Sequence, residues 1–232
     1  MIAVTFALPA ESSAFLRRFR EKSRISHSGI EVICGEIDHC VVEILHTGVG
    51  EQICRQRIGR YLLHRQPACL ISAGFAGALD DQLQVGDLLL AENFSTPRLT
   101  KIRALVSTAP IHSGKLLTVP AIIDSIEERK RIAQTAFASA VDMETEFIAR
   151  ACAQYGTPLL SLRVISDTPA NPFPARSQVL FDVMKQRTDT LKFASFFLMH
   201  PNRLPRLIQF ARRIVRARKT LANALFEVVC NL

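Results

Sequence analysis

The stretch from 141 to 168 constrains the fold most, because it reads as a strand, a helix and a second strand. It runs VDMETEFIARACAQYGTPLLSLRVISDT. A short apolar run over 138–141 leads into a pattern with apolar residues at three- and four-residue spacing, and Gly156 stands where that helix should end. The apolar run over 159–165 then reads as a buried strand. This order predicts a βαβ unit with parallel strands, which is typical of an α/β protein.

Two carboxylates follow these two strands. Glu144 comes just after the first and Asp167 just after the second. Ligands of open α/β sheets bind at the edge where parallel strands end. If neighbouring strands deliver both side chains there, the pattern suggests an acid/base site. The alternative is that Glu144 is a helix-start charge and Asp167 a turn residue, because acids are common in both places.

The rest of the chain alternates between short apolar strands and amphipathic helices, as expected for one α/β domain. The expected strands cover 2–8, 31–36, 41–46, 68–72, 84–91 and 116–119, and the expected helices cover 52–65 and 125–134. The segment 92–115 shows little periodicity and is typical of chain that lines or covers a pocket. Glu11, the Thr47-Gly48-Val49-Gly50 turn and a predicted glycine turn at 74–77 also follow strands, so parallel strands would gather them at the same edge.

Charge is unevenly distributed along the 232 residues. The formal net charge is +8, but residues 190–232 contain eight Lys and Arg residues against Glu227 alone. The remainder is close to neutral, which argues against a scattered basic face for nucleic acid. We therefore predict a catalytic domain over 1–189 and a basic, amphipathic helical extension over 190–232.

Cysteine usage and the N-terminus point to the cytoplasm. The six cysteines show no CxxC motif and no pairing pattern, as expected in a reducing compartment. The N-terminus lacks a basic region before its apolar run, and no segment reaches the roughly 20 apolar residues of a membrane span.

Four motifs, ALPAE, HTGVG, SAGFAGAL and VDMET followed by RVISD, together resemble the nucleoside phosphorylase/nucleosidase superfamily over residues 1 to about 170. The resemblance is closest to the branch with methylthioadenosine/S-adenosylhomocysteine nucleosidase and the hopanoid-associated phosphorylases. It implies a three-layer α/β/α fold with a central mixed, largely parallel sheet, and cleavage of an N-ribosidic bond. It also implies no metal, no cofactor beyond phosphate as a possible co-substrate, and a homo-oligomer such as a dimer.

The same resemblance assigns roles to individual residues. Met143 and Glu144 would hold the ribose, and Asp167 would protonate or hydrogen-bond N7 of the purine. Glu11 and Arg163 would position the attacking water or phosphate, although Arg163 could instead be a structural ion-pair partner. The remaining substrate-binding residues implied are Ala121, Ile122 and Ile123 along the base, with Thr47, Gly48, Gly74 and Phe75.

A carboxylic acid that gives its proton to the departing base accelerates such a cleavage by roughly 10²–10⁴. Asp167 would have to be protonated near neutral pH, which burial away from cations would favour. Ser72 and Phe75 stand where phosphorylases of the superfamily carry an Arg and a small hydroxyl residue. These departures weaken the case for phosphate as the nucleophile. The short 92–115 segment would leave the 5′ side of the nucleoside open.

The basic tail gives a second indication of the substrate. From residue 203 onward a basic amphipathic helix is predicted, which could lie on an anionic membrane surface or pack on the body with a solvated basic face. The leading hypothesis is an enzyme at the inner membrane surface that cleaves adenine from a 5′-substituted adenosine such as adenosylhopane. The alternatives are a soluble methylthioadenosine/S-adenosylhomocysteine-type nucleosidase and a non-catalytic nucleoside-binding protein.

Overall fold

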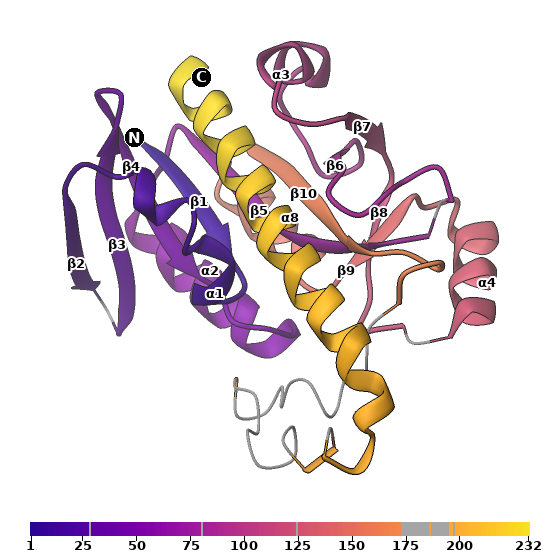
Figure 1. Cartoon of the computed structure of the whole chain (residues 1–232). Coiled ribbons are helices and arrows are strands. Elements are labelled where there is room, and N and C mark those ends of the chain that lie inside the picture. The colour runs from indigo at the N-terminus through magenta and orange to yellow at the C-terminus, as the bar shows by residue number, and fades with distance from the viewer. Residues whose placement is uncertain (28, 80, 124, 173–185, 187–194, 197) are drawn as a thin grey trace.

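A computed structural model of the chain describes residues 1–27, 29–79, 81–123, 125–172, 186, 195–196 and 198–232. Its centre is a sheet of ten strands, eight of which are paired in the order β2-β3-β4-β1-β5-β10-β6-β7 (Figure 1). The strands are β1 Ile2–Phe6, β2 Lys22–His27, β3 Ile30–Ile37, β4 Cys40–His46, β5 Cys69–Ala78, β6 Leu88–Ala91, β7 Ile111–Gly114, β8 Leu116–Thr118, β9 Ala140–Asp142 and β10 Leu159–Asp167.

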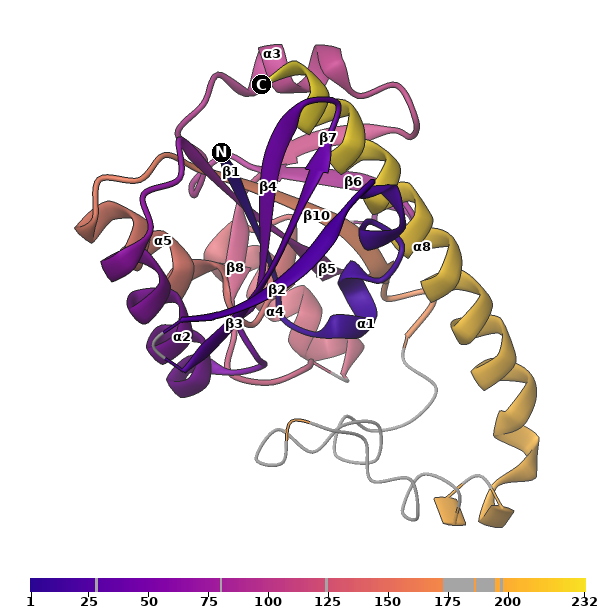
Figure 2. The same cartoon turned by 90° about the vertical axis from the view of Figure 1, so that its left-hand side faces the viewer.

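Helices cover both faces of this sheet, so the predicted three-layer α/β/α architecture is confirmed. Helices α2 and α5 lie against one face, and α8 crosses the other (Figure 2). The described helices are α1 Pro9–Ser12, α2 Glu51–His64, α3 Leu99–Leu105, α4 Ile126–Ala136, α5 Thr145–Gln154 and α8 Leu204–Asn231, with 3₁₀ turns at Leu16–Arg18 and Pro201–Arg203.

The sheet is mixed, as predicted. β1 pairs in parallel with β4 and with β5, and β10 runs parallel to β5. Antiparallel pairs join β10 to β6 and β2 to β3. The central strands are buried from both sides, so they read as continuous apolar runs rather than as alternating patterns.

The prediction that the strands before and after α5 form a parallel, neighbouring pair is wrong. β9 runs antiparallel to β5, with Val141 opposite Gly77, and β5 separates it from β10. The chain leaving β9 therefore travels back along β5. That reversal brings Glu144 towards the middle of β5, whereas Asp167 ends β10 opposite Gly77.

The predicted glycine turn at 74–77 is also wrong, because β5 continues through it to Ala78. Gly74 and Gly77 are extended residues of a central strand, and each lies beside a carboxylate. A Cβ at Gly74 would lie 3.7 Å from both carboxylate oxygens of Glu11, and one at Gly77 would lie 3.1 Å from Oδ2 of Asp167. Gly77 thus leaves room for the carboxylate of Asp167 directly against the strand, whereas a Cβ at Gly74 would make only an ordinary van der Waals contact with Glu11.

The other glycine segment is a true turn. Gly48 and Gly50 have φ angles of 80° and 93°, which glycine adopts without strain. A Cβ at Gly48 would lie 2.6 Å from the side chain of Ile53. The turn carries the chain from β4 into α2 at the edge of the sheet where β1 also ends.

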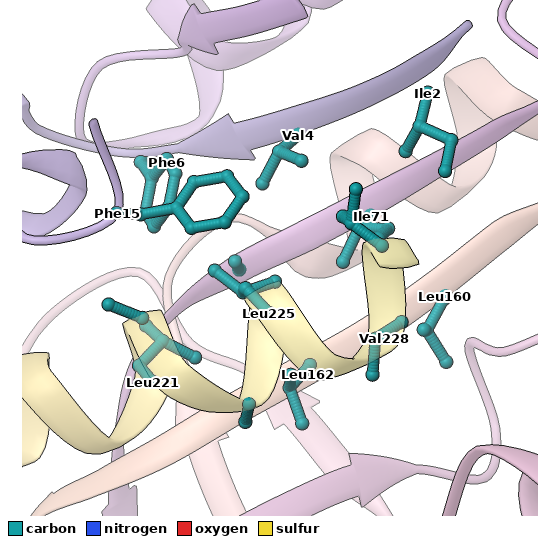
Figure 3. Close-up of a cluster of buried hydrophobic side chains, with 14 of the residues drawn as sticks. Ile2, Val4, Phe6, Phe15, Ile71, Leu160, Leu162, Leu221, Leu225 and Val228 are labelled. Carbon is teal, nitrogen blue, oxygen red and sulfur yellow. The ribbon is translucent and has the colours of Figure 1, made fainter. Parts of the chain in front are cut away.

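The C-terminal half of α8 belongs to the hydrophobic core. Leu221, Leu225 and Val228 are at most 1% exposed and pack against β1, β5 and β10 (Figure 3). The apolar face expected of this amphipathic helix is therefore buried only in its C-terminal half, since Ile208 and Val215 are 52% and 46% exposed. The predicted boundary at 189/190 lies outside the described residues.

Other differences concern short elements. β2 lacks an apolar run because it is an exposed edge strand, so it was not predicted. The segment 92–115, predicted to be irregular, contains α3 and β7. Their apolar residues are too few to show a period, and they form regular structure through contacts with α8 and β6.

Candidate active site

A small pocket lies where β1, β4 and β5 approach the start of α5. Its lining combines two carboxylates, one guanidinium and several small residues: Thr5, Phe6, Ala7, Glu11, Thr47, Ser72, Ala73, Gly74, Phe75, Glu144, Ile148 and Arg163. The free volume is about 10 Å³, which suits a single water-sized group. Of the expected site residues, the pocket brings together Glu11, Glu144, Arg163, Thr47, Gly74 and Phe75.

Glu11 reaches the pocket from the short helix after β1. Its Oε2 accepts hydrogen bonds from the backbone N–H groups of Ala7 and Leu8, at 2.9 and 3.1 Å. These bonds hold the carboxylate over Gly74. Burial raises the pKa of Glu11, and the two backbone N–H groups and Arg163 oppose that shift. An acid that is held in place and takes up a proton more readily than usual is suited to act as a base towards a bound water.

Glu144 stands at the N-cap position of α5, but it does not cap the helix. Its Oε1 instead accepts a hydrogen bond from the N–H of Gly50 in the glycine turn, at 3.2 Å. Burial, followed by repulsion from Asp142 and Glu11, raises the pKa of Glu144 to about 8. The structure therefore places two carboxyl groups in one pocket, where at neutral pH they share fewer than two negative charges.

Arg163 lines the pocket, but its donors are turned towards the protein. Its Nη2 lies 2.9 Å from Oδ2 of Asp142 and 2.8 Å from Oγ of Ser72, and it also contacts Thr145. Nη1 donates to the carbonyl oxygens of Ser72 and Leu162, at 2.6 and 3.2 Å. Nε donates to Asp142 as well, at 3.2 Å. This geometry is that of the structural ion-pair partner, the alternative role considered for Arg163.

Asp167 is buried as expected, but it does not lie away from cations. Its Oδ2 forms an ion pair with Arg129 of α4, and its Oδ1 accepts a hydrogen bond from Ser166 at 2.6 Å. Arg129 also donates to the carbonyl oxygens of Ile123 and Ala78, at 3.1 and 3.2 Å. The expected condition for a protonated Asp167 is therefore absent, because a guanidinium partner favours the ionised carboxylate.

The expected base-side residues lie apart from the lining of the carboxylate pocket. Asp167 and the segment 121–123 are not among its lining residues in the described part of the chain, and neither is Met143, which was expected at the ribose. Asp167 is opposite Gly77 and Arg163 is opposite Gly74, three positions along β5. At about 3.3 Å per residue, the two registers are roughly 10 Å apart. Arg129 connects two of the expected base-side residues, because it donates hydrogen bonds to the carbonyl oxygen of Ile123 and to the carboxylate of Asp167.

Three residues of this region were not predicted from the sequence. Asp142 stands in the VDMET motif, in which only Met143 and Glu144 were expected to contact the substrate. Arg129 lies in a charged helix and gave no signal. Thr5 is 1% exposed, and its hydroxyl has no hydrogen-bond partner among the described residues, although it lines the carboxylate pocket. A lone threonine in a strand is ordinary, so only the fold reveals it.

The described residues hold no group of three or more His, Cys, Asp or Glu arranged to bind a metal ion. None of the described helices is long and apolar enough to cross a membrane.

Comparisons with known proteins agree with the fold and the motifs. The family model of the phosphorylase superfamily matches residues 1–99 and 93–195. A methylthioadenosine/S-adenosylhomocysteine nucleosidase of Staphylococcus aureus (strain JH9) is 25% identical over 197 residues, covering 72% of this chain and 86% of that protein.

Two solved structures are similar in fold. The Campylobacter jejuni 5′-methylthioadenosine/S-adenosylhomocysteine nucleosidase has a TM-score of 0.74 and 16% identity, and the match covers 100% of this chain and 99% of that one. A futalosine hydrolase mutant of Helicobacter pylori has a TM-score of 0.60 and 19% identity, with coverage of 71% and 89%. The resemblance seen in the sequence motifs is thus confirmed, and the chain belongs to the phosphorylase superfamily of enzymes.

Proposed function

We propose that this protein is a nucleosidase that cleaves the N-ribosidic bond of an adenine nucleoside, with water as the acceptor. The observation that carries the proposal is the pair of buried carboxyl groups, Glu11 and Glu144, in one pocket beside β5. The names of the curated and structural relatives favour a substrate of the methylthioadenosine/S-adenosylhomocysteine type. They support this alternative better than the adenosylhopane hypothesis.

In this proposal the two carboxyl groups have different tasks. Glu11 is fixed by two backbone N–H groups and orients the attacking water near the anomeric carbon. Glu144, held by Gly50, bonds the ribose hydroxyls, with Met143 beside it. The negative charge that the pair carries stabilises the positive charge that develops on the sugar. Thr47, Gly48, Gly74 and Phe75 would surround the sugar, and Ala121 to Ile123 would lie along the purine.

Asp167 and Arg163 take revised roles. An ionised Asp167, paired with Arg129, would hold the purine by accepting a hydrogen bond from its amino group and, once solvent has supplied the leaving base with a proton at N7, a second one from N7. Arg163 would act on the substrate only indirectly, because its ion pair with Asp142 fixes the backbone segment that leads to Glu144. It is thus a positioning residue rather than a ligand of the nucleophile.

The charges that line the carboxylate pocket favour water over phosphate as the nucleophile. Arg163 is the one cation among the described lining residues, and its donors are bonded to Asp142, Ser72, Leu162 and Thr145. A phosphate dianion placed beside two carboxyl groups would therefore lack a compensating charge.

A second candidate is the same cleavage on an adenosine with a bulky, lipid-like 5′ group such as adenosylhopane. The exposed, basic first half of α8 favours it, because Leu204, Ile208 and Val215 are all more than 40% exposed there. In that case the enzyme would work at the inner membrane surface. The first candidate needs only the cytoplasm, and for both we propose a homodimer.

The test is adenine release from methylthioadenosine with and without inorganic phosphate. We expect release at equal rates in both buffers, with a free sugar and no sugar 1-phosphate as the second product. Glu11→Gln should lower the rate by about 10² or more, whereas Glu51→Gln, on the exposed start of α2, should not. A requirement for phosphate would overturn the choice of water. Binding of nucleosides without release of adenine from any of them would support the non-catalytic alternative instead.

A further inference from the structure

A second and larger pocket lies between α8 and two loops at the end of the sheet. Its free volume is about 390 Å³, and its described lining shares no residue with the carboxylate pocket. The lining consists of Asp81, Leu83, Gln84, Val85, Gly86, Thr168, Ala170, Asn171, Arg213, Arg216 and Ala217. The proposed nucleosidase reaction uses none of these residues.

Two guanidinium groups form the helix side of this pocket. Arg213 and Arg216 are three positions apart on α8, so they share one face of the helix. Among the described residues, no carboxylate forms an ion pair with either of them, although Asp81 lines the same pocket. Arg213 makes one long hydrogen bond, at 3.4 Å, to Gln209. The lining therefore carries an excess of positive charge.

The loop side adds neutral polar groups on a fixed backbone. The loop before β6 is held by hydrogen bonds from Gly86 N–H to Ile165 and from Asp87 N–H to Gln84, at 2.9 and 3.0 Å. Thr168 and Asn171 bond each other through both backbone N–H groups, and Thr168 Oγ1 also accepts from Asn171 N–H at 3.1 Å. The hydroxyl of Thr168 and the side-chain amide of Asn171 donate no hydrogen bond to any described residue, so both can serve as donors to a ligand.

We propose that this pocket binds the phosphate group of a phosphate ester. Two guanidinium forks supply charge and paired N–H donors, which match the several oxygens of a phosphate better than the two of a carboxylate. The volume leaves room for the esterified group as well. That ester could be a soluble metabolite or the headgroup of a phospholipid, because the exposed Ile208 and Val215 lie on the same helix.

The probes are glycerol 3-phosphate, measured by titration calorimetry, and vesicles of phosphatidylcholine with phosphatidylglycerol, measured by co-sedimentation. The full-length chain is compared with Arg213→Gln, Arg216→Gln and the matched control Arg206→Gln. Arg206 is exposed on α8 and does not line the pocket, so its replacement removes the same charge. We expect the affinity for at least one probe to fall about tenfold in the pocket variants, because each loses one charge-assisted hydrogen bond to the phosphate. In the Arg206→Gln control the affinity should fall less.

The two probes distinguish the sources. Binding of glycerol 3-phosphate alone assigns the site to soluble esters, and binding of vesicles alone assigns it to a lipid headgroup. Binding of both, with the same dependence on Arg213 and Arg216, shows that the phosphate group itself is recognised. The proposal is overturned if neither probe binds, or if Arg206→Gln weakens binding as much as the pocket variants do. Unchanged adenine release in these variants would keep this test separate from the proposed enzyme activity.

Discussion

The carboxylate of Asp167 is paired with the guanidinium of Arg129, and the two side chains are only 1% and 3% exposed. The sequence places one at the end of a strand and the other inside a charged helix, 38 residues apart. The pair joins α4 to the end of β10, and through Ile123 and Ala78 it also fixes the start of α4 and the end of β5. It therefore fixes the position of the expected base-side carboxylate and places a cation beside it.

Removing one member of this pair should be costly. We expect Arg129→Met to lower the free energy of unfolding by about 3–5 kcal/mol, because a buried carboxylate would lose its partner. In Arg129→Met/Asp167→Asn, which removes both charges, part of that loss should return. Urea denaturation of the unmodified protein, of each single variant and of the double variant gives the coupling energy between the two side chains. A loss below about 1 kcal/mol for Arg129→Met would show that the pair is not buried as described.

Replacing Glu144 should change how stability depends on pH. Its folded pKa of about 8 lies above the ordinary value of 4.5, so the folded protein holds this proton more tightly than the unfolded chain. The stability that this proton provides is complete below about pH 4.5 and is lost as the pH rises to about 8. Each group of this kind contributes a slope of at most about 1.4 kcal/mol per pH unit. Glu144→Gln should flatten the curve in that window.

The control for this prediction is Glu146→Gln, on the same helix, where the carboxylate is partly exposed and pairs with Arg150. That variant should keep the slope of the unmodified protein. Chemical denaturation at several pH values between 4.5 and 8 measures both curves. Parallel curves for Glu144→Gln and the unmodified protein would contradict the burial of Glu144 beside Asp142 and Glu11.

Three glycines allow a matched comparison of alanine substitutions. A Cβ at Gly77 would lie 3.1 Å from Asp167 and 3.5 Å from Arg129, whereas one at Gly59 of α2 would meet nothing within 4 Å. Gly77→Ala should therefore displace the ion pair and destabilise the fold. Gly59→Ala should stabilise it by about 0.5–1 kcal/mol, the usual gain in a helix. Gly74→Ala, at 3.7 Å from Glu11, should be tolerated better than Gly77→Ala. Thermal unfolding of all three variants ranks them, and an equal effect at Gly59 and Gly77 would contradict the contact.

Much of the architecture could be predicted from local patterns, since the apolar runs of β1, β4 and β5 and the period of α2 are readable without a fold. The direction of β9 could not be predicted, because its three residues do not indicate the strand with which they pair. The extension of β5 through Gly74 was missed for a related reason. Glycine usually marks a turn, and at Gly77 it is the contact with Asp167, from a neighbouring strand, that explains a glycine within β5.

In the candidate site, too, some residues could be predicted from the sequence whereas their contacts could not. Glu11 and Glu144 follow predictable elements, and the fold brings both into one pocket. The partners that hold these side chains come from other parts of the chain: Arg129 for Asp167, Asp142 for Arg163, and Gly50 for Glu144. Long-range contacts of this kind leave no pattern in neighbouring residues. A charged residue in a sequence can therefore suggest a role, but its protonation depends on partners that only the fold reveals.

Asp142 offers a test that joins structure to activity. Its carboxylate accepts hydrogen bonds from Arg163, from Thr145 N–H at 3.1 Å and from Thr118 Oγ1 at 2.8 Å, and its charge is the second largest cause of the raised pKa of Glu144. In Asp142→Asn that repulsion disappears and Arg163 loses its counter-charge. Both changes favour the ionised form of Glu144, so the pKa of Glu144 should fall below about 8.

We expect the rate of adenine release to change with pH where Glu144 titrates. In Asp142→Asn this limb of the pH–rate profile should move to lower pH. A loss of packing alone would reduce the rate at every pH without moving the limb. The control is Asp142→Asn/Glu144→Gln, in which no such limb should remain. An unmoved limb in the single variant, at a measurable rate, would show that Asp142 does not set the charge of Glu144 and that the two carboxyl groups of the pocket titrate independently of it.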